Sequence, residues 1–83
     1  MFVYWSSPLG DLERDDVEDA LNEALGPDGE VVGAGSGLSG SNLDLEISAN
    51  PERALAAVKA ALVELGMPAD TYVVMDGRRH RLV

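Results

Sequence analysis

The chain has 83 residues, 46% hydrophobic and 25% charged, which predicts one globular domain over residues 1–83 rather than a disordered segment. Fifteen acidic residues stand against six Lys and Arg, giving a formal net charge of −9. This balance argues against direct nucleic-acid binding, because phosphate contacts depend on Lys and Arg. The sequence has no cysteine, so disulfides and thiolate-bound metals are excluded.

The N-terminal segment predicts no export. Residues 1–5 lack the basic region that opens a secretory signal. No apolar run approaches the roughly 20 residues that a membrane-spanning helix needs. We therefore expect a cytoplasmic protein with no membrane partner.

The first third of the chain predicts a strand and then a helix. Residues 2–5 are all β-prone and are followed by a proline and a glycine. An apolar stripe at helical spacing comes next, with Asp11 or Asp15 as the expected N-cap, and residues 26–29 end the helix. The stripe consists of Val17, Ala20, Leu21, Ala24 and Leu25.

The remaining two thirds predict three or four strands and a second helix. The Asn50-Pro51 pair is a strong helix start and Gly66 a strong stop, while Asp76-Gly77 favours a two-residue hairpin turn. The expected elements are a strand over 30–34, a flexible Gly/Ser-rich connection over Gly33–Ser41, a strand over 42–49, the helix, a strand over 71–75 and a short strand over 79–83.

The order of these elements is β-α-β-β-α-β with an appended strand. Each helix has a single apolar stripe and needs an apolar sheet face to cover it. With right-handed crossovers, this order predicts an α+β fold, the ferredoxin-like split βαβ two-layer sandwich with both helices on one face. A swapped or dimeric sheet built from the same elements is the alternative.

The glycine-rich segment contains one apparent nucleotide motif. Gly35, Gly37 and Gly40 satisfy G-x-G-x-x-G, but a strand rather than a helix follows. A dinucleotide site needs a helix N-terminus at that point to hold the pyrophosphate. We therefore interpret these glycines as a connection between strands.

A second motif resembles the nucleotidyltransferase signature. Gly35-Ser36 precedes a strand in which Asp44 and Glu46 lie on one face, and Asp76 follows a later strand as a third carboxylate. The resemblance implies a metal-dependent nucleotidyl or phosphoryl transferase, whose chemistry uses paired carboxylates. The gap between Gly-Ser and Asp44 is shorter than in that family. The alternative is that Asp44 and Glu46 are the solvated side of an amphipathic strand.

Other catalytic patterns are missing from the sequence. The one histidine, His80, lies between Arg79 and Arg81 near the chain end, and no serine lies in G-x-S-x-G. We expect a non-enzymatic protein without a cofactor.

The acidic charge is concentrated in one part of the chain. Residues 11–30 carry a net charge of −8, whereas residues 78–83 carry +3. One interpretation is that this charge only keeps the protein soluble. The other is that it forms a docking surface for a basic protein, because complementary electrostatic fields speed association. On the first helix, the outward acids are Asp15, Asp16, Asp19 and Glu23.

The aromatic residues indicate a second surface. Alternation places Phe2 and Tyr4 on one side of the first strand, and Val3 and Trp5 on the other. One of these pairs faces away from the helices, beside Asp44, which suits sheet-to-sheet dimerisation or protein recognition. We expect Tyr4 or Trp5 to serve as an aromatic anchor for a partner.

The run from Gly35 to Ile47, followed by a helix at Asn50-Pro51, resembles small acidic bacterial single-domain proteins with a Gly/Ser-rich segment between the second and third strands. This resemblance implies a standalone domain and no particular activity. The sequence favours a non-catalytic, protein-binding module: an inhibitor or immunity protein that docks a basic target, either a toxin or a nucleic-acid enzyme. A metal-dependent transferase and a homodimer joined through the sheet face are the alternatives.

Overall fold

The computed structural model describes residues 1–37 and 40–82. Within these residues the fold is α+β, with two α-helices and a five-stranded antiparallel sheet, which is compatible with the expected two-layer sandwich. The elements are β1 (Phe2–Trp5), α1 (Arg14–Leu25), the 3-10 turn η1 (Gly26–Asp28), β2 (Gly29–Gly37), β3 (Gly40–Ile47), α2 (Pro51–Leu65), β4 (Tyr72–Met75) and β5 (Arg78–Arg81).

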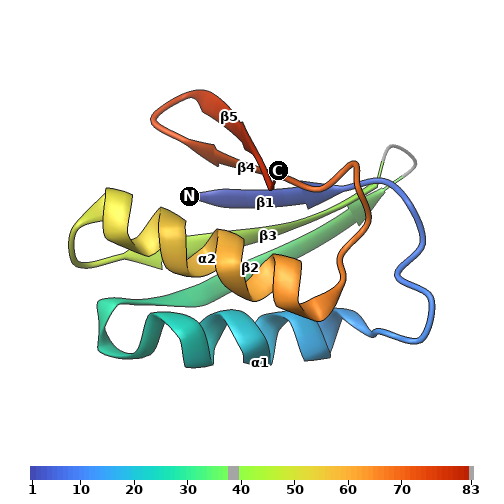
Figure 1. Cartoon of the computed structure of the whole chain (residues 1–83), viewed down its shortest axis with the longest axis horizontal. Helices are drawn as coiled ribbons and strands as arrows, with labels where there is room; N and C mark the ends of the chain where they lie inside the picture. The colour runs from blue at the N-terminus through green and yellow to red at the C-terminus, as the bar shows by residue number, and fades with distance from the viewer. Residues whose placement is uncertain (38–39, 83) are drawn as a thin grey trace.

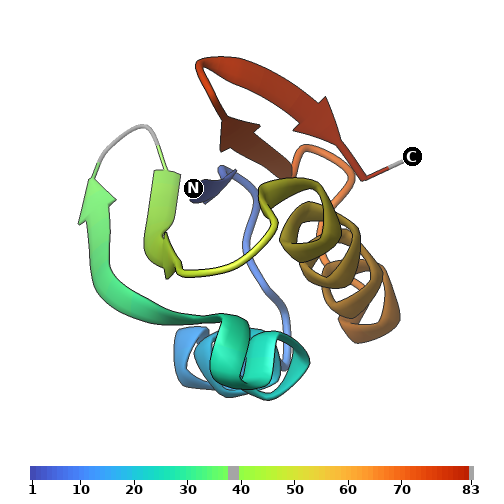
Figure 2. The same cartoon turned by 90° about the vertical axis from the view of Figure 1, so that its left-hand side faces the viewer.

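The strands lie in the order β2-β3-β1-β4-β5, and every neighbouring pair is antiparallel. Both helices cover the same face of this sheet and pack against each other (Figures 1 and 2). No helix from the described part of the chain covers the opposite face of the sheet (Figure 2). Strand β1 is thus the middle strand of a sheet that is covered on one side only. Among the described residues, no helix is long and apolar enough to cross a membrane.

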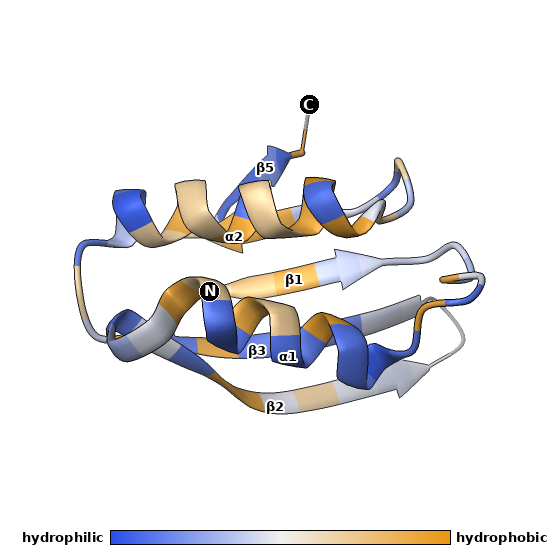
Figure 3. Ribbon diagram, turned by 60° about the horizontal axis from the view of Figure 1, so that its bottom comes forward, coloured by the Kyte–Doolittle hydropathy of each residue, from blue (hydrophilic) through white to orange (hydrophobic). Residues whose placement is uncertain are grey.

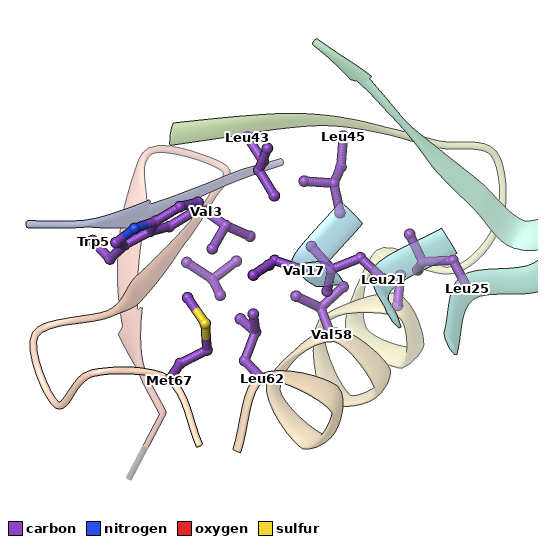
Figure 4. Close-up of a cluster of buried hydrophobic side chains, with 12 residues drawn as sticks. Val3, Trp5, Val17, Leu21, Leu25, Leu43, Leu45, Val58, Leu62 and Met67 are labelled. Carbon is purple, nitrogen blue, oxygen red and sulfur yellow. The ribbon is translucent and has the colours of Figure 1, made fainter. Parts of the chain in front are cut away.

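The core lies between the sheet and the helices. Alternation along β1 turns Val3 and Trp5 inward, whereas Phe2 is 38% exposed on the open face. Figure 4 shows the inward side chains of β1 and β3 meeting those of the two helices. The buried cluster consists of Val3, Trp5, Val17, Leu21, Leu25, Leu43, Leu45, Ala54, Val58, Leu62, Met67 and Val73.

Helix α1 begins near the expected place but with a different cap. The N-cap is Glu13, not Asp11 or Asp15. The Asp16 carboxylate accepts a hydrogen bond of 2.9 Å from the Glu13 backbone N–H. The cap therefore uses the reciprocal contact of a capping box three residues into the helix, and an acid at this position also interacts favourably with the helix dipole.

Helix α2 begins and ends as its sequence predicts. The Asn50 side-chain oxygen accepts hydrogen bonds of 2.9 Å from the Glu52 N–H and 3.2 Å from the Arg53 N–H. Pro51 occupies the first turn, where a missing N–H has no cost. Gly66 closes the helix in the left-handed region, with φ of 76°.

Replacing Asn50 by alanine tests this cap. We expect Asn50→Ala to lower the free energy of unfolding by about 1 kcal/mol, because two N–H groups of the first turn lose their acceptor. Asn50→Asp keeps an acceptor oxygen and should retain most of the stability. Urea unfolding of the three proteins measures the difference; an equal loss in both variants would contradict the cap.

The predicted flexible connection over Gly33–Ser41 is wrong for most of its length. Residues 33–37 belong to β2 and residues 40–41 to β3, and the two strands pair as far as Gly37 opposite Gly40. Backbone hydrogen bonds override the low β-propensity of glycine and serine here, because β3 is anchored on its other side by β1. Residues 38–39 of the predicted connection lie outside the described residues.

The last strands differ slightly from their predicted bounds. Strand β4 begins at Tyr72, and the preceding Thr71 is a buried side chain. Asp76 and Gly77 have φ of 54° and 74°, which is the backbone of a type I′ hairpin turn. Strand β5 covers Arg78–Arg81 rather than 79–83, and Val83 lies outside the described residues.

Candidate functional site

The four predicted acids of α1 lie on its solvent side. Asp15, Asp16, Asp19 and Glu23 are all exposed, and Figure 3 shows hydrophilic residues alternating with apolar ones along α1. Asp16 differs from the others because its carboxylate caps the helix. Asp15, Asp19 and Glu23 are therefore the members of this set whose charge has no capping role.

A groove of about 570 Å³ lies between α1 and α2. Its apolar lining comes mainly from alanines, whose short side chains leave space between the two helices. One carboxylate from each helix, Glu23 and Glu64, also lines it. The lining residues are Ala20, Glu23, Ala24, Ala61, Glu64 and Leu65.

The acidic surface of α1 continues into this groove. Residues four apart on a helix are neighbours on its surface, so Asp19 lies one turn before Glu23 and Asp16 one turn before Ala20. Glu23 thus belongs both to the acidic surface and to the groove. We call the six lining residues together the acidic groove; Asp15 and Asp19 lie outside it, on the exposed surface of α1 that leads to Glu23.

Only part of the acidic groove is predictable from the sequence. Ala20 and Ala24 belong to the apolar stripe expected to face the sheet, but Ala24 is exposed and Ala20 half-buried. No sequence pattern singles out Glu64. The signal was the alanine spacing itself, since alanines on both helices leave room at a helix crossing that larger residues would fill.

Aromatic side chains form a row across the open face of the sheet. The Tyr4 and Tyr72 rings stack with centroids 5.3 Å apart, and the Phe2 ring lies 6.1 Å from Tyr4. The Arg79 guanidinium carbon lies 4.8 Å from the Tyr72 ring centroid. The outward pair is therefore Phe2 and Tyr4.

Trp5 lies in the core. Its side chain is 4% exposed, because alternation along β1 turns it toward the helices together with Val3. Trp5 is thus not available as the aromatic anchor that the sequence suggested. Tyr4 is part-exposed on the open sheet face and does not line the acidic groove.

Charges flank the aromatic row on both sides. Toward β2, Asp44 lies opposite Phe2 in the register, and Glu46 lies directly opposite Glu30. Toward the other edge, Arg79 lies opposite Val74 and Arg81 opposite Tyr72. The open face is therefore acidic along β2 and β3, aromatic in the middle and basic along β5.

The three carboxylates of the transferase-like alternative are not gathered together. Asp44 and Glu46 lie on β3, whereas Asp76 lies in the β4–β5 turn, with β1 between these strands. Within residues 1–37 and 40–82, no group of three His, Asp or Glu side chains is placed to hold a metal ion. His80 lies opposite Val73 in the register, as a strand residue, with its Nε2 atom buried and unpartnered.

Two surfaces of this molecule therefore bring distinctive side chains together: the acidic groove in the helical layer and the charged aromatic face of the sheet. The first places carboxylates around an apolar lining. The second places opposite charges at its two edges. No protein-family model matches the chain, and no curated protein or solved structure is significantly similar to it.

Proposed function

We propose that the chain is a non-catalytic binding module that docks a basic protein in the acidic groove. The observation that carries this proposal is the groove itself, whose small apolar lining is accompanied by Glu23 and Glu64 and extended by the acids of α1. An inhibitor or immunity-type role fits this geometry, with a toxin or a nucleic-acid enzyme as the class of target. The metal-dependent transferase has no comparable support, because its carboxylates lie apart.

The proposed ligand is an amphipathic segment of the target. Its apolar side chains would cover the groove residues, which supplies the non-directional part of the affinity. Its Lys and Arg side chains would lie beside the carboxylates. Such rim charges chiefly raise the association rate and select the partner.

We also propose a specific topology for the fold. The strand order β2-β3-β1-β4, with both helices on one face, supports the ferredoxin-like split βαβ arrangement, with β5 added at one edge. This arrangement pairs the two helices side by side over the sheet. The acidic groove follows from that pairing.

The first test uses a synthetic probe. A peptide of about 18 residues spans roughly 27 Å as a helix, close to the 31 Å length of the molecule. One version carries lysines on one helical face and leucines on the other. A second version has the same composition in scrambled order, so its charge is matched but it has no apolar face.

The probe should bind more tightly in its amphipathic order, because only that order presents an apolar face to the groove. Calorimetry or fluorescence anisotropy at about 0.15 M salt, where the screening length is about 8 Å, gives both dissociation constants. Equal affinity for the two peptides would mean that binding reflects only the general attraction between a basic peptide and an acidic protein. That result would overturn docking in the groove.

Charge reversal on α1 should weaken the amphipathic probe. Changing Asp15 and Asp19 together to lysine raises the net charge from −9 to −5, and we expect about a tenfold rise in Kd. Asp19→Lys alone leaves the first turn of α1 intact and should show a smaller loss in the same direction. The same titration measures all variants.

The matched control places the same charge change on the other layer. Changing Glu30 and Glu46 to lysine also takes the net charge from −9 to −5, but these residues lie on the sheet. Its Kd should stay within about twofold of the parent value, since rim charges act locally at moderate salt. Equal weakening by both double variants would contradict the proposed location.

A further inference from the structure

We propose that the open sheet face binds a second copy of the same chain, packed face to face about a twofold axis that runs parallel to β1. This inference is independent of the acidic groove, which lies in the helical layer. It rests on three features of the face: its aromatic centre, its charged edges and its strand order.

The edges of the face have opposite charges. Glu30 lies on edge strand β2, and Asp44 and Glu46 lie on the neighbouring β3. Arg79 and Arg81 lie on β5, the other edge strand. A face with this distribution is complementary to itself when one copy is turned over.

The strand order decides the direction of that turn. Rotation about an axis parallel to β1 exchanges the two edges, so β2 of one copy lies over β5 of the other, while β1 lies over β1. The acidic edge of each copy then lies against the basic edge of the other, so the favourable contact forms twice. Rotation about an axis across the strands would place β2 over β2 and β5 over β5, which like charges oppose. Aligned strands are also the common packing of two sheets.

The centre of the face suits protein contact. Aromatic residues and arginine are enriched at interfaces, and this face combines Phe2, Tyr4 and Tyr72 with Arg79. The molecule measures 31 × 24 × 24 Å, so a whole face covers on the order of 700 Å², close to the ~800 Å² per partner of a standard interface. A second copy that covered the whole face would therefore bury nearly as much surface as a standard specific dimer.

The same geometry disfavours a nucleic acid on this face. Sheets that bind single strands stack bases on open aromatic rings. Here one face of Tyr4 lies against Tyr72, and Arg79 lies over the Tyr72 ring. The acids Asp44 and Glu46 lie beside the row and repel phosphate. A copy of this chain brings its own arginines to those acids.

Sedimentation of the full chain over a range of concentrations tests the proposal. We expect a monomer–dimer equilibrium that weakens as salt is added, because the edge charges are screened. Changing Arg79 and Arg81 to glutamate should raise the dimer Kd about tenfold or more, since both edges become acidic. Arg81→Glu alone leaves the Arg79–Tyr72 contact in place and should weaken the dimer in the same direction.

The control makes the same charge change in the helical layer. Arg53→Glu with Lys59→Glu takes the net charge from −9 to −13, as does the Arg79/Arg81 pair, but both residues lie on α2. This control should dimerise like the parent chain. Circular dichroism of each variant verifies that the fold is retained.

Mixing two variants gives the sharpest result. A chain with Glu30→Arg and Glu46→Arg has two basic edges and should not pair with itself. Mixed with the Arg79→Glu/Arg81→Glu chain, it should form a heterodimer, because each basic edge then meets an acidic one. A parent chain that stays monomeric up to about 1 mM, or a dimer that survives the Arg79/Arg81 change, would overturn the proposal. So would binding of a single-stranded oligonucleotide to this face.

Discussion

Gly40→Ala should lower the free energy of unfolding by about 2–4 kcal/mol. Gly40 has φ of 132°, a conformation that side chains rarely adopt. A Cβ atom there would lie 2.5 Å from the Trp5 carbonyl oxygen and 3.1 Å from the Ser6 Cα. Both are backbone atoms at the end of β1, which pairs with β3 and cannot give way as a flexible side chain would. The added Cβ atom therefore forces β1 and β3 apart next to Trp5.

Gly37→Ala is the matched control for this substitution. Gly37 lies directly opposite Gly40 in the β2–β3 hairpin, but a Cβ atom there would have nothing within 4 Å. Its stability should stay within about 0.5 kcal/mol of the parent value. Urea unfolding of the two variants gives the comparison, and equal stabilities would contradict the close approach of β3 to β1.

Leu21→Ala should have an equally large effect, lowering the free energy of unfolding by about 2–5 kcal/mol. The Leu21 side chain is 0% exposed and lies among the core side chains between α1 and the sheet (Figure 4). Removing it leaves a cavity that neighbouring side chains fill only partly. Since small domains are stable by about 5–15 kcal/mol, this is a large share of the total.

The control for Leu21 is an apolar residue outside the core. Val63 on α2 is 50% exposed, so Val63→Ala removes little buried surface and should change stability by less than about 0.5 kcal/mol. Thermal or urea unfolding distinguishes the two. A Leu21→Ala protein as stable as Val63→Ala would contradict the placement of α1 over the sheet.

Patterns that depend on near neighbours in the chain were predictable. The Asn50 cap with Pro51 and the Asp76-Gly77 turn are each set by a few adjacent residues, and each has the expected structure. In the apolar stripe of α1, Val17, Leu21 and Leu25 are buried as expected. The alternation along β1 likewise predicts that Phe2 and Tyr4 share one face and Val3 and Trp5 the other. It does not predict which pair faces the helices, because that depends on packing against the rest of the core.

The N-cap of α1 is a local failure, since Glu13 and Asp16 are three residues apart. The larger failures depend on residues far apart in the chain. The Gly33–Gly37 segment has low β-propensity and becomes a strand because β3 supplies hydrogen-bond partners. Trp5 and Tyr4 differ in burial only because the helices cover one face of the sheet. The acidic groove needs both helices side by side, so neither helix predicts it alone.

The two proposed surfaces lie on opposite layers and do not compete. Self-association through the open sheet face would cover Phe2, Tyr4 and Tyr72. It would leave the helices exposed, because they lie on the other side of the sheet (Figure 2). A dimer of this kind presents two acidic grooves pointing away from each other. A basic target would therefore bind with one copy per groove.

Docking in the acidic groove is tested most directly by a nuclear magnetic resonance titration of the isotope-labelled full chain with the amphipathic lysine–leucine peptide. The largest amide shifts should cluster on both sides of the groove, at Ala20, Glu23, Ala24, Ala61, Glu64 and Leu65. Shifts spread evenly over every acidic segment, or confined to the sheet at Tyr4 and Asp44, would contradict docking in the groove.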